Sequence, residues 1–278
     1  MTVRAPLPFA PRSLLFVPGS RPDMIAKLPR WTADAAVIDL EDAVPVTGKD
    51  TAREAGVAAA AELDLPGTAV LVRVNPAGSP WFRDDLRAVA GPVAGGAVDG
   101  VVLPKCESSA GLVEVRAAMP GGVIVAGLET AAGVAGCRDL LARDVDAAYF
   151  GAEDYIADLG GRRTVAGLEV LHARSEVMLA CRLAGISAID QAVVAIGDDE
   201  RYLADAAAGR AIGYTGKICV HPRQVELAHR VFTPSAAEVA HAREVLAVAE
   251  AGVGTVDGQM VDDVHVRMAR QVLDRARD

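Results

Sequence analysis

The chain alternates short apolar runs with longer mixed stretches, and this alternation predicts its fold. Eight runs rich in Val, Ile, Leu and Ala lie at residues 14–17, 35–39, 70–75, 101–105, 123–129, 147–151, 189–196 and 218–221. Each run is too short for a helix, and stretches of helical length rich in Ala, Leu, Arg and Glu separate the runs. The pattern predicts eight parallel strands alternating with helices, which is the α/β fold called the (β/α)8 or TIM barrel, over residues 1–233.

A second segment, residues 234–278, follows the last predicted barrel helix. Ser235 and Glu238 have the spacing of a capping box, which marks the start of a helix. Residues 261–272 form another helical stretch. The sequence therefore predicts a C-terminal helical extension of two helices.

The apolar runs end in charged residues. In a (β/α)8 barrel the C-terminal ends of all strands meet at one mouth, where the chemistry takes place. Charged residues that would share this mouth are Asp39, Glu41, Asp42, Arg73, Lys105, Glu129, Glu153 and Asp154. The sequence therefore predicts a single polar site.

Two of these carboxylates, Glu129 and Asp154, end consecutive predicted strands. Adjacent carboxylates repel each other unless a cation lies between them, and Mg²⁺ prefers such oxygen ligands together with water and substrate oxygens. The alternative is that the two residues cap helices or form ion pairs with nearby arginines. The residues alone leave both interpretations open.

Arg73 lies within an apolar run, where burying a cation is costly without an anionic partner. One interpretation is a structural ion pair with Asp39 or Glu41 from the neighbouring strand. The other is that Arg73 binds a substrate carboxylate or stabilises an enolate.

Four basic residues follow the first two predicted strands: Arg21, Lys27, Lys49 and Arg53. Positive charge near the predicted mouth is concentrated in these four residues, and such a patch suits a phosphorylated ligand. Basic residues on exposed helices are often merely solvated, so this alternative also stands.

Composition narrows the possible partners. The net charge is −9, only 4% of residues are aromatic, and the pI is near 5.1, which argues against nucleic acid because its phosphates require a basic surface. No apolar run approaches the roughly 18 residues that a membrane span requires, and the four cysteines lack CxxC spacing. We therefore expect a cytoplasmic protein without a membrane anchor or structural zinc. Cys106 has no histidine placed to activate it, so a nucleophilic role is disfavoured.

Several motifs together give a resemblance to a known family. They are LFVPGSRP at 15–22, DLEDAV at 39–44, Lys49 with Arg53, RVN at 73–75, LPK at 103–105, LET at 128–130, GAED at 151–154, HP at 221–222 and GQMVD at 258–262. The set, in this order and spacing, resembles the citrate lyase β-subunit-like family of aldolases and lyases, which includes malyl-CoA and citramalyl-CoA lyases.

The resemblance implies a magnesium-dependent barrel that binds its metal through Glu129 and Asp154. It implies that Arg73 stabilises a thioester enolate and that Asp262 is the acid/base group. Because the matching aspartate in the family commonly reaches the active site of a neighbouring subunit, the resemblance also implies a homo-oligomer, a trimer or a hexamer.

The resemblance further implies that Glu41, with Asp42, lines the outer shell of the metal, and that the four basic residues face the phosphates of coenzyme A. The implied reaction is reversible carbon–carbon cleavage of a carboxylated 3-hydroxyacyl-CoA. Malyl-CoA, citramalyl-CoA and a citryl thioester remain open as substrates, as does thioester hydrolysis. One departure lies after Asp190, where many members have an aromatic and a second acidic residue and this chain has Gln191.

Overall fold

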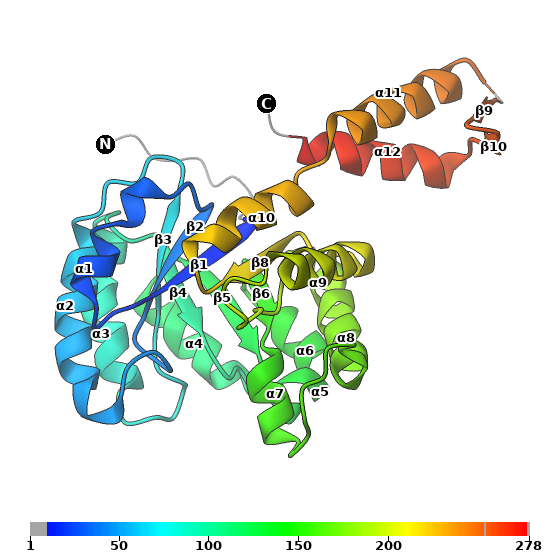
Figure 1. Ribbon diagram of the computed structural model, residues 1–278. Coiled ribbons are helices and arrows are strands. Elements are labelled where there is room, and N and C mark those ends of the chain that lie inside the picture. The colour runs from blue at the N-terminus through cyan, green and yellow to red at the C-terminus, as the bar shows by residue number, and fades with distance from the viewer. Residues whose placement is uncertain (1–9, 253, 277–278) are drawn as a thin grey trace. The chain divides into compact units, whose positions relative to one another are not determined.

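The computed structural model describes residues 10–252 and 254–276 and confirms the predicted barrel. Eight parallel strands pair in chain order and close into a ring (Figure 1). The strands are β1 (Ser13–Pro18), β2 (Ala35–Asp39), β3 (Ala69–Arg73), β4 (Gly100–Leu103), β5 (Val123–Leu128), β6 (Ala147–Phe150), β7 (Ser187–Asp190) and β8 (Gly216–Cys219). Pairing of Leu14 with both Ala35 of β2 and Ile218 of β8 closes the ring.

Helices connect successive strands on the outside of the barrel, and a last helix, α10, follows β8 (Figure 1). They are α1 (Pro22–Ile25), α2 (Lys49–Ala61), α3 (Phe82–Ala94), α4 (Ser109–Ala118), α5 (Ala131–Ala135), α6 (Cys137–Leu141), α7 (Ala152–Asp158), α8 (Leu168–Ala184), α9 (Asp199–Ile212) and α10 (Pro222–Phe232). Short 3₁₀ turns occur at η1 (Leu28–Arg30) and η2 (Val46–Gly48). This arrangement leaves the C-terminal strand ends, with their charged residues, on one face.

The barrel interior is a packed aliphatic core. Inward-facing side chains from all eight strands fill it, namely Leu14, Ala35, Val37, Leu71, Val102, Val125, Ala147, Tyr149, Ile189 and Ile218. Because alternate residues of a strand face opposite sides, the remaining strand residues pack beneath the helices. The interior is therefore filled below the mouth.

The prediction was wrong for the extent of the seventh strand. It ends at Asp190 rather than at residue 196, and residues 191–197 form a loop. Pairing with β8 stops at Asp190 and Lys217. The next carbonyl, that of Gln191, instead accepts a hydrogen bond from the Lys217 ammonium at 2.7 Å. A side-chain hydrogen bond thus replaces the backbone pairing of β7 and β8 at Gln191. The hydrophobic periodicity of the sequence could not reveal this.

The C-terminal residues form a second compact unit, which divides from the barrel between Ala228 and His229, within α10 and before the predicted boundary. It contains α11 (Ala236–Glu250), the short strands β9 (Thr255–Val256) and β10 (Gln259–Met260), and α12 (Asp263–Arg275). The predicted capping box of Ser235 and Glu238 is confirmed. Its small core consists of Ala242, Val245, Val256 and Ala269. The two short strands were not predicted.

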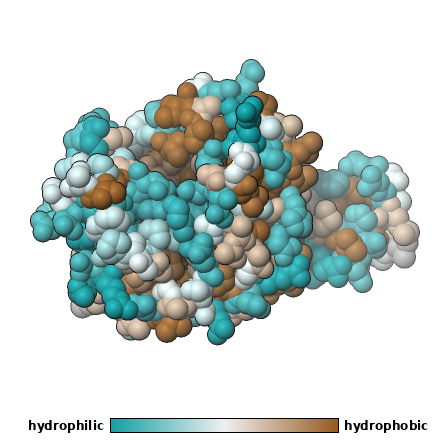
Figure 2. Space-filling model, turned by 90° about the horizontal axis from the view of Figure 1, so that it is seen from below, coloured by the Kyte–Doolittle hydropathy of each residue, from teal (hydrophilic) through white to brown (hydrophobic). Residues whose placement is uncertain are grey.

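The surface carries both polar and apolar areas. The face shown in Figure 2 is mainly hydrophilic, with separate apolar patches. Within residues 10–252 and 254–276, no helix combines the length and apolar character needed to cross a bilayer.

A buried charge cluster ties the last two barrel strands to the helices outside them. The Lys217 ammonium, on β8, donates to Asp190 of β7 at 2.8 Å and to Asp205 of α9 at 2.5 Å. Arg174 of α8 binds both carboxylate oxygens of Asp190, at 2.8 and 2.5 Å. A Cβ on Gly209 would lie 2.3 Å from Asp190 Oδ2, so a side chain at this position would disrupt the cluster.

The cluster predicts a large stability cost for removing its lysine. Lys217→Met leaves the buried Asp190 and the partly buried Asp205 with only one cation, Arg174, and removal of one partner from a buried ion pair costs about 3 kcal/mol or more. Urea unfolding should show a loss of this size, whereas the exposed Lys27→Met should change the free energy of unfolding by less than about 0.5 kcal/mol. Equal effects of the two substitutions would show that the cluster contributes nothing specific.

Candidate active site

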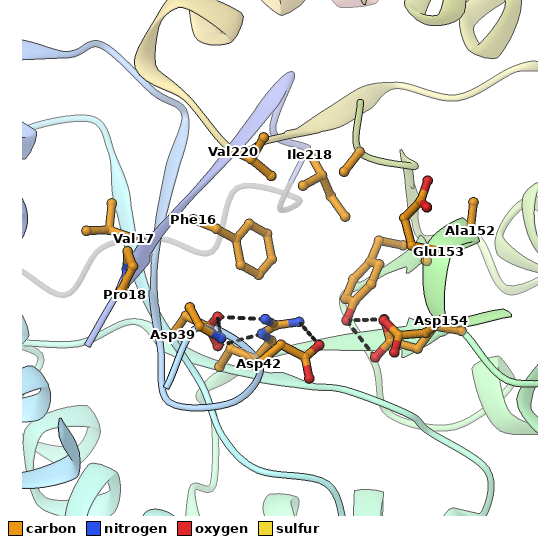
Figure 3. Close-up of a pocket in the computed structure, with 16 residues that line it drawn as sticks. Phe16, Val17, Pro18, Asp39, Asp42, Ala152, Glu153, Asp154, Ile218 and Val220 are labelled. Atoms are coloured by element: carbon orange, nitrogen blue, oxygen red, sulfur yellow. Dashed lines mark hydrogen bonds and ion pairs between the residues drawn. The ribbon is translucent and has the colours of Figure 1, made fainter. Parts of the chain in front are cut away.

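A cavity of about 390 Å³ opens at the C-terminal ends of the barrel strands. One side is apolar and includes Phe16, Ile218 and Val220, whereas Asp42 and Asp154 lie on the opposite side (Figure 3). The full lining is Phe16, Val17, Pro18, Asp39, Asp42, Ala43, Arg73, Glu129, Tyr149, Gly151, Ala152, Glu153, Asp154, Ala192, Ile218 and Val220. The cavity can therefore accommodate a ligand with one charged and one apolar part.

Arg73 is held at the cavity wall by two carboxylates. Its guanidinium donates to both oxygens of Asp39, at 2.7 and 2.6 Å, and lies 2.8 Å from Glu41 Oε2. It also lies over the ring of Phe16, with Cζ 5.1 Å from the ring centroid. Burial alone would lower the pKa of Arg73, but the adjacent charge of Asp39 outweighs it and raises that pKa well above its ordinary value. The ion pairs expected from the sequence are present, and the same guanidinium faces the cavity.

Glu129 is a buried carboxylate fixed by two donors, the Tyr149 hydroxyl and the Lys105 backbone. The Tyr149 hydroxyl lies 3.0 Å from both its oxygens, and the backbone N–H of Lys105 donates to Oε1 at 2.8 Å. Burial, followed by the charge of Asp154, raises the pKa of Glu129. Gly151 leaves room for this carboxylate, because a Cβ there would lie 2.4 Å from Oε2. These contacts are not those of a helix cap.

Asp154 is more exposed than Glu129 and faces the same cavity. It lies in the first turn of α7, and its Oδ1 is 3.4 Å from the Lys105 ammonium. In the described part of the chain no group of three or more His, Cys, Asp or Glu side chains could enclose a metal ion. The carboxylates of Glu129 and Asp154 both line the cavity and could supply two ligands to a metal ion, with its other positions left to water or substrate.

Glu41 lies behind the cavity wall rather than in it. Its carboxylate is 2.8 Å from Arg73 and 2.5 Å from the Lys105 ammonium, and the residue is only 3% exposed. Burial raises the pKa of Glu41 to about 7 despite the opposing charge of Arg73. Its position suits a group that orients these two cations.

The four basic residues do not form one exposed patch, so this part of the prediction was wrong. The Lys49 ammonium is buried and donates to the carbonyls of Leu40 and Glu41, each at 2.8 Å. Arg53 is also buried, and it pairs with Asp85 at 2.6 Å and Asp50 at 2.8 Å.

Only Arg21 and Lys27 of the four are at the surface, where both lie near Asp23. Sequence reasoning took Lys49 and Arg53 for exposed residues because they occur on a polar-looking helix. The partners that bury them are two carbonyls of the loop after β2 for Lys49 and the carboxylate of Asp85, on α3, for Arg53.

Asp262 begins α12 in the C-terminal unit. Its carboxylate accepts the backbone N–H groups of Val264 at 2.9 Å and His265 at 3.1 Å, and lies 2.6 Å from His265 Nδ1. These hydrogen bonds lower the pKa of Asp262. The carboxylate is half exposed and ionised, the form in which it can accept a proton.

Sequence reasoning gave no role to Tyr149 or to the backbone of Lys105. Tyr149 lies in an apolar run and could not be distinguished from a core aromatic. Lys105 has a φ of 45°, and this left-handed backbone aims its N–H at Glu129. Cys106 is buried with its pKa raised to about 12 by burial, which agrees with the expectation that it is no nucleophile.

Comparison with known proteins shows the family of this chain. Residues 12–222 match the family model described as HpcH/HpaI aldolase/citrate lyase. Residues 180–278 match a second model, described as a C–C bond lyase of the TIM-barrel fold. The chain belongs to the HpcH/HpaI aldolase/citrate lyase family.

Particular relatives are similar over nearly the whole chain. A citrate lyase subunit beta-like protein of Deinococcus radiodurans is 49% identical over 94% of this chain and 96% of its own length. A (3S)-malyl-CoA thioesterase of Cereibacter sphaeroides is 34% identical over 95% of this chain and 94% of its own length. Among solved structures, the chain is similar to CitE from Mycobacterium tuberculosis in complex with magnesium, acetoacetate and coenzyme A. The TM-score is 0.83 at 34% sequence identity, over 97% of this chain and 99% of the CitE chain.

The raised pKa of Glu41 predicts a specific pH dependence of stability. An unfolded Glu41 releases its proton near pH 4.5, whereas the folded one retains it to about pH 7. The stability associated with the protonated form is therefore lost as the pH rises through this window, by about 3 kcal/mol in total. Urea unfolding with chelator should show this decline in the wild type and not in Glu41→Gln. Parallel stability curves from pH 4.5 to 8 would refute the assignment.

Proposed function

We propose that this protein is a magnesium-dependent lyase that cleaves a carbon–carbon bond in a carboxylated 3-hydroxyacyl-CoA, such as malyl-CoA or citramalyl-CoA. The observation that carries the proposal is the placement of the buried Arg73 guanidinium at a cavity that also contains Glu129 and Asp154. Family membership and the magnesium and coenzyme A in the CitE structure support it.

The residues at the mouth fit a divalent cation. Five carboxylates, those of Asp39, Glu41, Asp42, Glu129 and Asp154, share the region with two cations, Arg73 and Lys105. Burial, followed by the charge of Asp154, raises the pKa of Glu129, and a cation beside these two carboxylates would offset that charge. We assign Glu129 and Asp154 as the metal-holding residues, and bound Mg²⁺ would act as a Lewis acid toward the substrate's carboxylate and hydroxyl oxygens.

The chain's own residues then account for the rest of the chemistry. When the hydroxyl oxygen loses its proton, the bond between the carbon that bears it and the α-carbon of the thioester breaks. The bonding electrons pass to the thioester as an enolate, and its α-carbon takes up one proton to give the acyl-CoA. Arg73 stabilises the enolate oxygen, because a fixed, desolvated cation is most effective where charge develops. Asp39 and Glu41 hold Arg73 in place.

Asp262 is the proposed acid/base group, and it acts in the active site of a neighbouring subunit. Its carboxylate is half exposed and therefore accessible to a ligand. The resemblance of the GQMVD segment at 258–262 to the family supports action in a neighbouring subunit. The proposal therefore includes a homo-oligomer, a trimer or a hexamer.

Of the basic residues, Arg21 and Lys27 remain the proposed contacts for the coenzyme A phosphates, since both are exposed after β1. Lys49 and Arg53 are proposed to support that region from within. The apolar wall formed by Phe16, Ile218 and Val220 suits the uncharged part of the substrate.

Two alternatives follow from the relatives. The similarity to a citrate lyase subunit beta-like protein supports a subunit that acts on a citryl thioester within a complex. The similarity to a malyl-CoA thioesterase supports hydrolysis of the thioester on the same scaffold. The products distinguish these activities, because a lyase releases an acyl-CoA and a thioesterase releases free coenzyme A.

A product assay tests the proposed reaction. The enzyme is incubated with Mg²⁺ and a panel of malyl-CoA, citramalyl-CoA and citryl-CoA, with acyl-CoA and free thiol measured in parallel. A lyase yields one acyl-CoA for each oxo acid formed and releases little free thiol. Arg73→Gln should lower the rate of this reaction by about 10²-fold or more. Thiol release equal to substrate consumption, without acyl-CoA, would instead establish a thioesterase.

A subunit-exchange experiment tests Asp262. Asp262→Asn should retain metal and substrate binding but lose about 10²–10⁴-fold in kcat, because only proton transfer is removed. Mixing it with Arg73→Gln protein under exchange conditions should restore part of the activity if each site combines two chains. Normal turnover by Asp262→Asn would exclude the catalytic role. Hybrid oligomers without recovered activity would exclude the cross-subunit arrangement.

A further inference from the structure

Lys105 occupies an unusual position at the mouth of the barrel. It follows β4 with a φ of 45°, in the left-handed region that L-residues other than asparagine and aspartate rarely adopt. A glycine would take this conformation without strain, yet the chain has a lysine. Strain of this kind persists only where surrounding contacts compensate for it.

The compensating contacts reach both proposed metal-holding residues. The Lys105 backbone N–H donates to Glu129 Oε1 at 2.8 Å. Its ammonium lies 3.4 Å from Asp154 Oδ1, 3.5 Å from Asp42 Oδ1 and 2.5 Å from Glu41 Oε1. One residue thus orients the first carboxylate through its backbone and neutralises the second through its side chain.

The side chains of the two cations of the site, Arg73 and Lys105, differ in how freely they can move. Arg73 is bound by Asp39 and Glu41, and its side chain is 11% exposed. The Lys105 side chain is 27% exposed and has four rotatable carbon–carbon bonds, so its ammonium can withdraw while the backbone stays in place.

An ammonium and a divalent cation next to the same carboxylate repel each other. Their repulsion is strong in a partly buried site, where the effective dielectric constant is far below that of water. We propose that Lys105 is an internal counter-ion that competes with the metal for Asp154 and holds the metal affinity of the free enzyme low. The inference rests on the proposed metal site.

The competition has a consequence for binding order. When a carboxylated substrate enters the cavity, one of its carboxylate oxygens offers the displaced ammonium a new partner. Metal and substrate then bind with positive cooperativity, and part of that coupling passes through Lys105. The residue thereby favours loading of the metal together with an anionic substrate.

Magnesium titration calorimetry on the chelator-treated full-length protein tests the inference. Lys105→Gly and Lys105→Asn remove the charge, and both residues tolerate the left-handed backbone that supports Glu129. Lys105→Arg retains the charge. We expect Mg²⁺ to bind the two neutral variants at least about tenfold more tightly than the wild type, and Lys105→Arg to stay within about threefold. Adding Glu129→Gln to Lys105→Gly should abolish the gain.

A purely structural role gives the opposite result. If Lys105 only held the carboxylates together, both neutral variants would bind Mg²⁺ more weakly, and that outcome, or unchanged affinity, overturns the inference. Addition of malate should increase Mg²⁺ affinity more in the wild type than in Lys105→Gly, and an equal increase contradicts the coupling. Magnesium binding to the wild type with no change in the variants refutes this inference alone. Absence of binding in every protein refutes the proposed metal site as well.

Discussion

The buried pairing of Arg73 with Asp39 is the interaction on which the rest of the site depends. The two residues end adjacent strands and lie opposite each other in the register of β2 and β3. Burial of either charge alone would be costly, so a charged residue at the end of one strand requires an opposite charge at the end of the other. Asp39 also accepts the backbone N–H groups of Glu41 and Ala43, which shapes the loop that follows β2. The ion pair therefore fixes both the cation and the acidic loop beside it.

The other charges follow from this pair by direct contact. Glu41 lies between Arg73 and the Lys105 ammonium, and the Lys105 backbone positions Glu129. A change in any one charge therefore alters the electrostatic environment of the next. Burial nevertheless raises the pKa of Glu41 to about 7, because it outweighs the opposing effect of the two cations.

The sequence predicted the barrel because strand and helix periodicities alternate eight times, and it predicted the mouth because charged residues end the runs. It failed where a contact between distant residues replaced a local pattern. The seventh strand ends early because Lys217 takes the carbonyl of Gln191. Lys49 is buried because its ammonium donates to two carbonyls of the preceding loop. The left-handed backbone of Lys105 has no signature in a sequence without glycine at that position.

The central claim is that Arg73 stabilises a thioester enolate at this mouth. Exchange of the α-hydrogens of acetyl-CoA with deuterium tests it directly, because exchange requires enolate formation and no carbon–carbon bond cleavage. In D₂O with Mg²⁺, the wild type should catalyse this exchange, and mass spectrometry of acetyl-CoA measures its rate. In Arg73→Gln that is folded and binds Mg²⁺, the exchange rate should fall by about 10²-fold or more. Exchange at the wild-type rate in Arg73→Gln would contradict the account.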